Sequence, residues 1–487
     1  MAAGDYLAMH CDGKAGLLPF SCAAVTAKQE GAEMKEAVEL VFIPVSLMGH
    51  LISAVEMAKL ITGRRELITI TILVLEQPHH HHRDPRITSY VRSQTKRSPR
   101  LNCATLTPAS DSSAASDPPA KVPNEGFRPQ VRDWVAGHGV GGSGRKLGGI
   151  IVDLFSTAMV DVADEFGVPA YVFFTSGAAT IGLFLYLKGK GTIREVCREQ
   201  IITRTRGVMI NTFSDLESHA VKALRDNDLM NFPPFYPVGP VLNLEKGEEE
   251  GEGEGEKKKK ILEWLDEREH DSVVFLCFGS NGYFYEEEEE QVKEIATGLE
   301  RSGHRFLWAL RHKREESDDD QNNQETNSTK GRSMLPEGFT ERTRERGMVI
   351  GWAPQVAILG HPAVGGFVSH CGSNSTLESV WFGKRLATWP MYAEQEANAF
   401  QIVKEMGVGV EMRMDCKKAK DINGGKAQVV GAEVIEEKVK ELMDPMSPIK
   451  FKAKEMSEMS RGALVEGGSS YASLLRFLDD VITNLSS

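Results

Sequence analysis

The sequence contains little of what marks a disulfide-bonded, zinc-binding or membrane-spanning protein. Its seven cysteines are scattered over 487 residues, from Cys11 to Cys416, without any C-x-x-C pair. An odd number with this spacing predicts reduced, buried thiols in a cytosolic protein and no zinc framework. No run of about 18 apolar residues occurs, since even "GGIIVDLFSTAMVDVADEF" is interrupted by Asp153, Asp161 and Asp164, so we expect no membrane-spanning helix.

An excess of basic charge is also lacking. The chain has 57 Lys and Arg against 69 Asp and Glu, a net charge of -12, and no basic stripe stands out. Nucleic acid and anionic membranes are therefore poor partners, and a small molecule is the better expectation. The stretch "GLLPFSCAAVTA" within residues 1–36 faintly resembles a signal peptide, but Asp5 and Asp12 stand where such peptides are basic. We therefore expect a disordered extension on a cytoplasmic protein.

What is present is a repeated alternation of short apolar runs and helical patterns, which predicts an α/β fold. The length exceeds what one hydrophobic core usually organises, so two domains are expected. We place the first over 37–242 and the second over 261–465, joined by the charged linker 243–260, whose Gly/Glu-rich composition cannot bury apolar surface. A C-terminal helix is expected over 466–487, with the first domain as one place for it to pack.

The apolar runs are continuous rather than alternating, as in parallel sheets covered on both faces. Polar segments at 79–148 and 312–334 read as surface loops. The predicted strands of the first domain are "VELVFIPV", "LITITILVL", "GGIIVDLF", "AYVFF" and "RGVMINT". Those of the second are "SVVFLCFGS", "HRFLWALR", "GMVIGWAP", "VGGFVSHCG" and "RLATWPM". Both domains are therefore predicted to be doubly wound parallel sheets.

Ligands of such sheets bind beyond the carboxyl ends of the strands, and polar residues follow several of the predicted strands. The segment from His370 to Ser375 suits an anion such as a diphosphate, because Gly372 permits close approach and a helix N-terminus follows. The alternative is that Ser375 to Glu378 is only a capping box, with Glu378 reaching back to the helix start.

The block "WAPQVAILGHPAVGGFVSHCGSNSTLESVWFGKRLATWPMYAEQ" resembles the signature box of plant UDP-sugar-dependent glycosyltransferases. Further segments resemble that family in its expected order: "LVFIPVSLMGHLISAVEMAKLI", "GGIIVDLF", "VMINTFSDLE", "YPVGPVL" and "VVFLCFGS". The resemblance covers about nine tenths of the chain. It implies two facing Rossmann-like domains of the GT-B type, UDP-glucose as co-substrate, no cofactor and a monomer.

The resemblance also implies the donor-binding residues. Trp352 would stack on uracil, Ala353 would read the edge of that base, and Gln355 and Glu378 would lie at the ribose. The diphosphate ligands would be Ser280, His370, Gly372, Ser373, Asn374 and Ser375. Glu394 and Gln395 would bind sugar hydroxyls, and Thr175 would reach the sugar from the first domain.

Catalysis would belong to His50 with Asp153 as its orienting carboxylate. His50 stands where a strand gives way to a helix, and the helix N-terminus disfavours the imidazolium, which would keep this base available near neutral pH. Asp153 would fix the tautomer and stabilise the cation that forms. The implied reaction is an inverting displacement on a UDP-sugar without metal, and no carboxylate pair of the glycosidase kind is identifiable.

Ser373 departs from the family, which usually has tryptophan there. The lost ring opens space beside the sugar, so glucuronate, galactose or a pentose are alternatives to glucose as donor sugar, and a non-catalytic UDP-sugar binder is an alternative to an enzyme. An oxidoreductase on two Rossmann-like domains is a further alternative. For the acceptor, small phenolics such as flavonoids or simple hydroquinones are expected, since the segment around His50 resembles enzymes that act on them.

Several literal motifs are given no function. Gly137 to Gly142 spells G-x-G-x-x-G but precedes a strand instead of following one, the reverse of a dinucleotide fingerprint. His79 to His82 and Asp318 to Asp320 are interpreted as exposed loop residues rather than metal ligands. The sequons at Asn327 and Asn374 matter only in a secreted chain.

Overall fold

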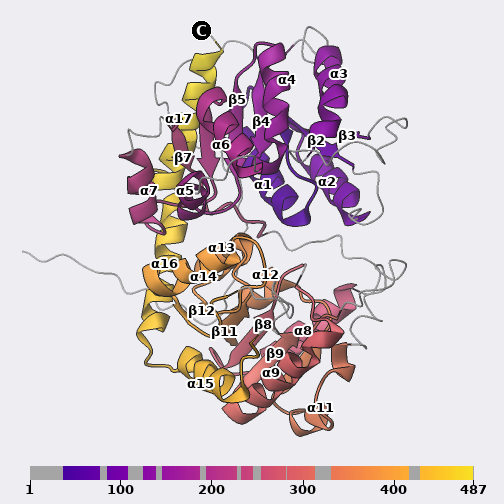
Figure 1. Cartoon of the computed structure of the whole chain (residues 1–487), viewed down its shortest axis with the longest axis vertical. Helices are drawn as coiled ribbons and strands as arrows, with labels where there is room; N and C mark the ends of the chain where they lie inside the picture. The colour runs from indigo at the N-terminus through magenta and orange to yellow at the C-terminus, as the bar shows by residue number, and fades with distance from the viewer. Residues whose placement is uncertain are drawn as a thin grey trace, which may run out of the picture. The chain divides into compact units, whose positions relative to one another are not determined.

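The computed structural model describes ten segments of the chain. These segments are 37–76, 85–107, 124–138, 145–186, 193–226, 232–244, 254–280, 282–312, 331–415 and 428–485. Residues from Met34 onward belong to one compact unit. Its described residues up to 244 form the first half, and those from 254 to 464 form the second half (Figure 1).

The first half is built on a parallel sheet that, within the described residues, has seven strands in the order β3-β2-β1-β4-β5-β6-β7. Its strands are β1 (Val38–Ile43), β2 (Ile68–Leu75), β3 (Leu101–Leu106), β4 (Lys146–Asp153), β5 (Ala170–Phe174), β6 (Gly207–Ile210) and β7 (Phe235–Pro237). Its helices are α1 (Met48–Arg64), α2 (Pro85–Arg97), α3 (Arg128–His138), α4 (Val160–Glu165), α5 (Ala178–Tyr186), α6 (Ile193–Arg204) and α7 (Ser218–Arg225), with short turns η2 (Glu125–Phe127) and η3 (Leu154–Met159). The strand order reverses between β1 and β4, where a doubly wound sheet places its ligand.

The second half has six parallel strands within the described residues, ordered β10-β9-β8-β11-β12-β13. They are β8 (Val273–Cys277), β9 (Arg305–Ala309), β10 (Gly347–Ile350), β11 (Val364–Ser369), β12 (Arg385–Thr388) and β13 (Gly409–Val410). Its helices are α8 (Glu254–Asp266), α9 (Glu289–Ser302), α11 (Phe339–Arg342), α12 (Gln355–Leu359), α13 (Ser373–Trp381), α14 (Gln395–Phe400), α15 (Ala432–Met443) and α16 (Pro448–Leu464), with η5 (Glu286–Glu288) and the π-helical turn η7 (Gln401–Glu405). Here the order reverses between β8 and β11.

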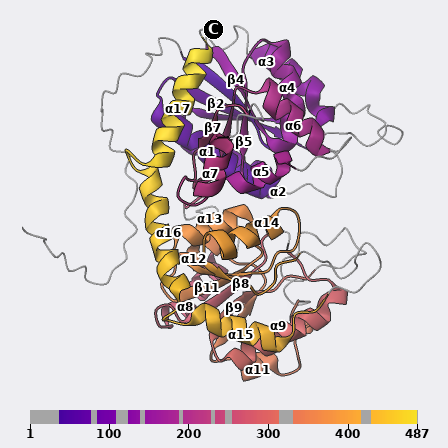
Figure 2. The same cartoon turned by 60° about the vertical axis from the view of Figure 1, so that its left-hand side comes forward.

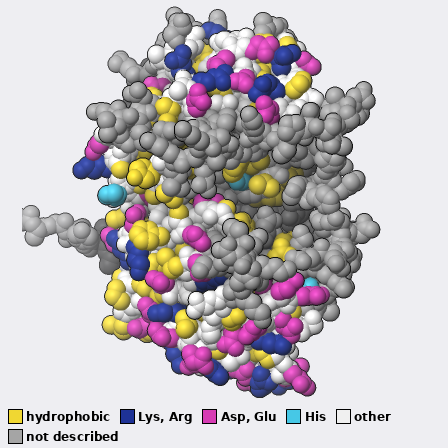
Figure 3. Space-filling view, viewed as in Figure 1, with side chains coloured by type: hydrophobic (Ala, Val, Ile, Leu, Met, Phe, Trp, Pro, Cys, Tyr) yellow, Lys and Arg dark blue, Asp and Glu magenta, His cyan; other side chains and the backbone are white. Residues whose placement is uncertain are grey.

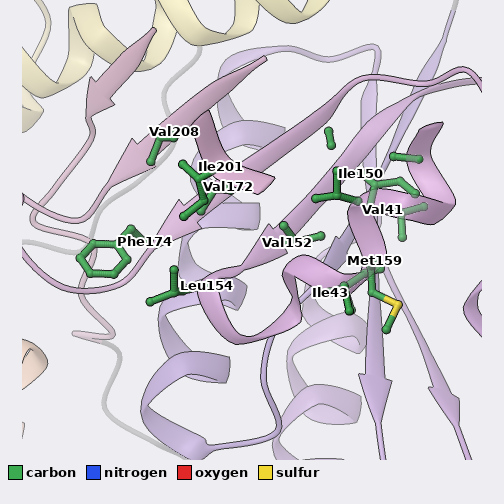
Figure 4. Close-up of a cluster of buried hydrophobic side chains, with 14 of the residues drawn as sticks. Val41, Ile43, Ile150, Val152, Leu154, Met159, Val172, Phe174, Ile201 and Val208 are labelled. Carbon is green, nitrogen blue, oxygen red and sulfur yellow. The ribbon is translucent and has the colours of Figure 1, made fainter. Parts of the chain in front are cut away.

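Both sheets are held by apolar side chains that alternate between two faces. In β1, Val41 and Ile43 pack in one cluster while Leu40 and Phe42 pack in the other. Figure 4 shows the first of these clusters, in which side chains of β1, β4, β5 and β6 interdigitate with Met159 and Ile201. Because each central strand buries both faces, its sequence is a continuous apolar run.

The last helix, α17 (Ser469–Asn484), packs on the sheet of the first half. Figures 1 and 2 show α16 beside the second half and α17 beside the first. Leu474, Phe477, Leu478 and Val481 enter the same cluster as Leu40 and Phe42. The hydroxyl groups of two tyrosines under α17 are hydrogen-bonded to it. Tyr236 donates to Asp480 Oδ2 at 2.6 Å, and Asn484 Nδ2 donates to the Tyr171 hydroxyl at 3.0 Å.

Two expectations about loops were wrong. The segment 79–148, expected to be a surface loop, contains α2, β3 and α3. The predicted linker 243–260 overlaps the start of α8 at Glu254. The boundaries of the two domains otherwise remain a prediction.

Cysteine burial was also predicted incompletely, because Cys277 and Cys371 are buried but Cys103 is exposed on β3. No described helix is both long and apolar enough to cross a membrane. The N-terminal extension 1–36, the histidine run 79–82, the aspartates 318–320 and the sequon at 327 lie outside the described residues.

Candidate active site

The side chains of His50 and Asp153 meet at the carboxyl edge of the first sheet. His50 lies in the first turn of α1, which follows β1, and Asp153 is the last residue of the adjacent β4. His50 Nδ1 is 2.7 Å from Asp153 Oδ2. The other carboxylate oxygen accepts the backbone N–H of Phe155 at 2.9 Å and so caps η3. One oxygen therefore fixes the carboxylate to the backbone and the other holds the imidazole ring.

The electrostatics of His50 differ from the sequence-based expectation. Burial lowers the pKa of the imidazole, but the charge of Asp153, its hydrogen bond and the charge of Glu394 together raise it above the usual value of 6.5. The expectation that the ring is biased toward its neutral form was wrong in direction, because the two carboxylates outweigh the effect of burial. With Nδ1 held by Asp153, Nε2 is the atom that can take a proton from a substrate.

The loop after β5 brings Thr175 and Ser176 to the same place. Thr175 Oγ1 lies 3.3 Å from His50 Nδ1. The Ser176 hydroxyl lies 3.4 Å from Glu394 Oε1, a residue of the second half. The group around His50 is therefore shared by both halves, and Ser176 was not among the residues singled out from the sequence.

His370 follows β11 and is buried against two glycines. A Cβ atom on Gly279 would lie 2.5 Å from His370 Nε2, and one on Gly372 would lie closer still, nearer than carbon and nitrogen approach. Gly279 has φ +80°, which favours glycine in any case. Burial lowers the pKa of His370 to about 4, so the ring is neutral near pH 7. Among the described residues its Nδ1 atom has no hydrogen-bond partner, as expected of a group that awaits a ligand.

Ser280 follows Gly279 in the turn after β8 and is exposed. Its carbonyl oxygen accepts Arg311 Nη1 at 2.6 Å, and the same nitrogen lies 3.3 Å from the Gly279 carbonyl oxygen. Arg311 also stacks over the ring of Tyr283, with its guanidinium carbon 4.2 Å from the ring centroid. A fixed positive charge thus supports the loop expected to bind the diphosphate.

Helix α13 begins at Ser373, with Gly372 as its N-cap residue and no side-chain cap. The alternative of a capping box from Ser375 to Glu378 is therefore wrong. Instead, Gln355 Nε2 donates to Ser375 Oγ at 2.8 Å and to Glu378 Oε2 at 2.7 Å. Burial raises the pKa of Glu378 to about 7, with the Gln355 bond opposing the shift. Figures 1 and 2 show α13 and α14 on the side of the second half that faces α1 and α5.

Trp352 and Ala353 lie between β10 and α12, next to Gln355, and both are partly buried. Glu394 and Gln395 begin α14 after Ala393, whose φ of +57° is unusual for a residue with a side chain. Gln395 Oε1 accepts the backbone N–H groups of Met391 and Tyr392 at 2.9 and 3.1 Å. Because Oε1 is occupied by these two bonds, the Nε2 group is the part of the Gln395 amide that remains for a sugar hydroxyl.

Ser373 and Asn374, expected at the diphosphate, contact the first half. Ser373 Oγ donates to Ser176 Oγ at 2.9 Å. Asn374 Nδ2 donates to the Gly49 carbonyl oxygen at 3.0 Å, and its Oδ1 accepts Ser53 Oγ at 3.1 Å. The tryptophan that the family usually has is thus replaced by a hydroxyl that joins the two halves. Nothing in the sequence pattern pointed to Gly49, Ser53 or Ser176 as partners.

Figure 3 shows acidic and basic side chains interspersed over the described surface of the second half on this face. Within the ten described segments no group of three or more His, Cys, Asp and Glu side chains is arranged to hold a metal ion. The described site therefore combines a partly buried base and its buried carboxylate on the first half with a glycine-lined histidine and the start of a helix on the second half.

Comparison with known proteins agrees with this arrangement. The family model described as "UDP-glucoronosyl and UDP-glucosyl transferase" matches residues 196–449. The chain is 39% identical to UDP-glycosyltransferase 71A15 of Malus domestica, over 92% of this chain and 100% of that protein. It is also 39% identical to UDP-glucose flavonoid 3-O-glucosyltransferase 6 of Fragaria ananassa, over 93% and 100%. The structure of Medicago truncatula UGT71G1 complexed with UDP-glucose superposes with a TM-score of 0.77 at 36% identity, covering 91% of this chain and 98% of that one. The chain therefore belongs to the UDP-glycosyltransferase family and has its GT-B fold of two Rossmann-like domains.

Proposed function

We propose that this enzyme transfers glucose from UDP-glucose to a hydroxyl of a small phenolic, flavonoid-like acceptor, with inversion at the anomeric carbon. The observation that carries the proposal is the His50–Asp153 pair, which lies next to Glu394 of the other half. The names of the relatives supply the sugar and the acceptor class, since one is a UDP-glucose flavonoid 3-O-glucosyltransferase.

In the proposed reaction, His50 Nε2 takes the proton from the acceptor hydroxyl as the oxygen attacks the anomeric carbon. The bond from that carbon to the diphosphate oxygen breaks on the opposite face, and UDP leaves with the electron pair. Asp153 keeps Nδ1–H directed away from the substrate and stabilises the imidazolium that forms. Thr175, 3.3 Å from the imidazole, would contact the sugar.

The donor residues take the roles implied by the family. Trp352 and Ala353 would hold uracil, while Gln355 and Glu378, already hydrogen-bonded to each other, would hold the ribose. The proposed diphosphate ligands are Ser280, His370, Gly372, Ser373, Asn374 and Ser375. Neutral donors and the start of α13 would then meet the charge that develops on UDP. Glu394 and Gln395 would bind the sugar hydroxyls.

Ser373 bears on the choice of sugar, but the alternatives it raised are less well supported. A non-catalytic binder would not need the paired base and carboxylate, and membership of the transferase family argues against an oxidoreductase. Replacement of the family's tryptophan by the Ser373–Ser176 hydroxyl pair leaves Glu394 in place beside it. We therefore retain glucose as the donor sugar, and a cytoplasmic monomer that needs no metal as the working description.

The test is product formation from UDP-glucose and a panel of flavonoids and simple phenols, with a chelator present. Wild type should give a hexose adduct with a β-anomeric proton coupling, and His50→Ala should lower the rate at least 100-fold. The matched control is His361→Ala, because His361 is also paired with a carboxylate, Asp266 at 3.1 Å, but lies outside the site. An α-configured product, loss of activity in chelator, or full activity of His50→Ala would each contradict the proposal.

A further inference from the structure

Glu217 is a buried carboxylate that the proposed chemistry does not use. It is 3% exposed and lies just before α7. It accepts three hydrogen bonds: from the backbone N–H of Ala178 at 2.7 Å, from that of Ala179 at 2.9 Å, and from Gln401 Nε2 at 2.7 Å. The first two donors belong to the first half and the third to the second half.

The bonds to Ala178 and Ala179 fix the start of α5. The first N–H groups of a helix have no partner within the helix, and a carboxylate there also suits the helix dipole. Gly177 makes the approach possible, because a Cβ atom on it would lie 2.6 Å from both oxygens of Glu217. Thr175 and Ser176 come directly before this point, so the position of α5 determines where they stand relative to His50 and Glu394.

The bond to Gln401 fixes a segment of the second half to the same carboxylate. Gln401 is 5% exposed and begins the π-helical turn η7, which continues the helix opened by Glu394 and Gln395. π-Helical turns occur often at functional sites. Asn398, in the same helix, accepts the Thr180 hydroxyl at 3.2 Å and donates to Ser373 Oγ at 3.3 Å. Glu217 therefore sits where the two sugar-facing segments are joined.

We propose that Glu217 is a positioning residue that, through Gln401, sets the spacing between the Thr175–Ser176 loop and the Glu394–Gln395 helix. The inference rests on the proposed function, because it assumes that these two segments hold the sugar between them. Glu217 touches neither donor nor acceptor in this account. We therefore expect its loss to change the turnover of bound substrates and the coupling between the halves. The binding of UDP by the second half alone should not change.

The sharpest variant is Gln401→Met, which removes the bond between the halves but leaves Glu217 to cap α5. We expect kcat for glucosyl transfer to fall at least fivefold, while the Kd for UDP stays within twofold of wild type. Gln291→Met is the matched control, because Gln291 is a buried glutamine whose Nε2 donates to the Val430 carbonyl at 3.0 Å entirely within the second half. Its kcat should stay within twofold of wild type.

Exchanging the side chains of Glu217 and Gln401 gives a rescue experiment. Glu217→Gln and Gln401→Glu should each lower kcat. In the first variant an amide NH2 group faces a helix N–H, so two donors meet, and in the second variant two carboxylates face each other. In the variant that carries both substitutions, the amide introduced at position 217 can donate to the carboxylate introduced at position 401, so kcat should recover to above that of either single variant. Recovery would not follow from a loss of packing alone.

Hydrogen exchange tests the coupling without relying on transfer. In wild type, UDP bound to the second half should slow exchange in a peptide spanning 175–182 of the first half, and in Gln401→Met this slowing should be lost. If wild type forms no glycoside, the proposed function fails while the exchange result still decides the coupling. If wild type is active but Gln401→Met matches it in kcat and in exchange, or if its UDP affinity falls in step with kcat, the positioning role is wrong.

Discussion

Asp153 controls His50 in two separable ways, through its charge and through the direction of its hydrogen bond. The charge raises the pKa of the imidazole, and the bond from Nδ1 fixes which nitrogen is left for the substrate. In Asp153→Asn the charge disappears, while the side-chain oxygen can still accept the Phe155 N–H. The amide NH2 group of the asparagine would then donate to Nδ1 of His50 and favour the tautomer in which the imidazole carries its proton on Nε2.

We expect Asp153→Asn to lower kcat by roughly 10²- to 10⁴-fold, because the base is held in the wrong tautomer. The acidic limb of the pH profile of kcat/KM should also move to lower pH, since the imidazolium loses the carboxylate that stabilised it. Asp266→Asn, which changes the distant partner of His361, should leave both unchanged. An acidic limb that stays in place would show that His50 is not the group that titrates.

Glu378 leads to a prediction for donor binding. Its carboxyl has a pKa raised to about 7 by burial, so it is largely protonated at pH 6 and largely ionised at pH 8. Two ribose hydroxyls donate better to a carboxylate, so affinity for the nucleoside should rise as pH increases through about 7. Uridine is the suitable probe, because it lacks the phosphate that would itself titrate. Calorimetry should find this rise in wild type, and Glu378→Gln should bind uridine equally at pH 6 and pH 8.

At the scale of elements, the sequence predicted ten of the described strands and missed β3, β7 and β13, which each lie at an edge of a sheet. β3 has one buried residue among exposed and partly buried ones, β7 has three residues, and β13 has two. β3 carries little apolar signal because most of its side chains are exposed or partly buried. β7 and β13 are buried, but runs of three and two residues are too short to show a period. Helix α2 contains few apolar residues, so its sequence carries little signal for a helix.

The candidate site was predicted in its composition but not in its contacts. Residues at the ends of parallel strands can be read from sequence, because the sheet brings those ends to one edge. The partners of Ser373 and Asn374 depend on rotamers and on how residues more than 190 positions apart come together. The direction of the pKa shift of His50 was wrong although its main cause, Asp153, was predicted as the partner, because the sequence gives neither the 2.7 Å hydrogen bond nor the added charge of Glu394.

The turn after β8 gives an element-scale prediction. Gly279→Ala places a Cβ atom 2.5 Å from His370 at φ +80°, so we expect about 2 kcal/mol lower stability and at least tenfold weaker UDP binding. Gly303→Ala is the control, because φ there is +74° but the nearest atom to the new Cβ is 4.0 Å away. That variant should lose about 1 kcal/mol and bind UDP normally. Equal UDP affinities in the two variants would contradict the role given to His370.

At the scale of the molecule, residues from Met34 onward form one compact unit, and its halves are joined by hydrogen bonds that Ser53 and Thr180 donate and that Ser176 and Glu217 accept. We expect one thermal transition, shifted as a whole by UDP, with about 2.7 kcal/mol of stabilisation at 100 times Kd. Scanning calorimetry checks this. Two transitions, of which UDP shifts only one, would show that the halves unfold independently.

The position of α17 has a consequence for synthesis of the protein on the ribosome. Phe477 and its neighbours complete the core of the first sheet, yet they are translated after the whole of the second half. Part of the apolar surface of the first half therefore stays exposed until the second half and α17 have been synthesised. Domains usually fold in the order of their synthesis, so this half cannot complete its core at its own turn. A truncation that removes α17 would therefore destabilise the first half, although that half is encoded furthest from the truncation.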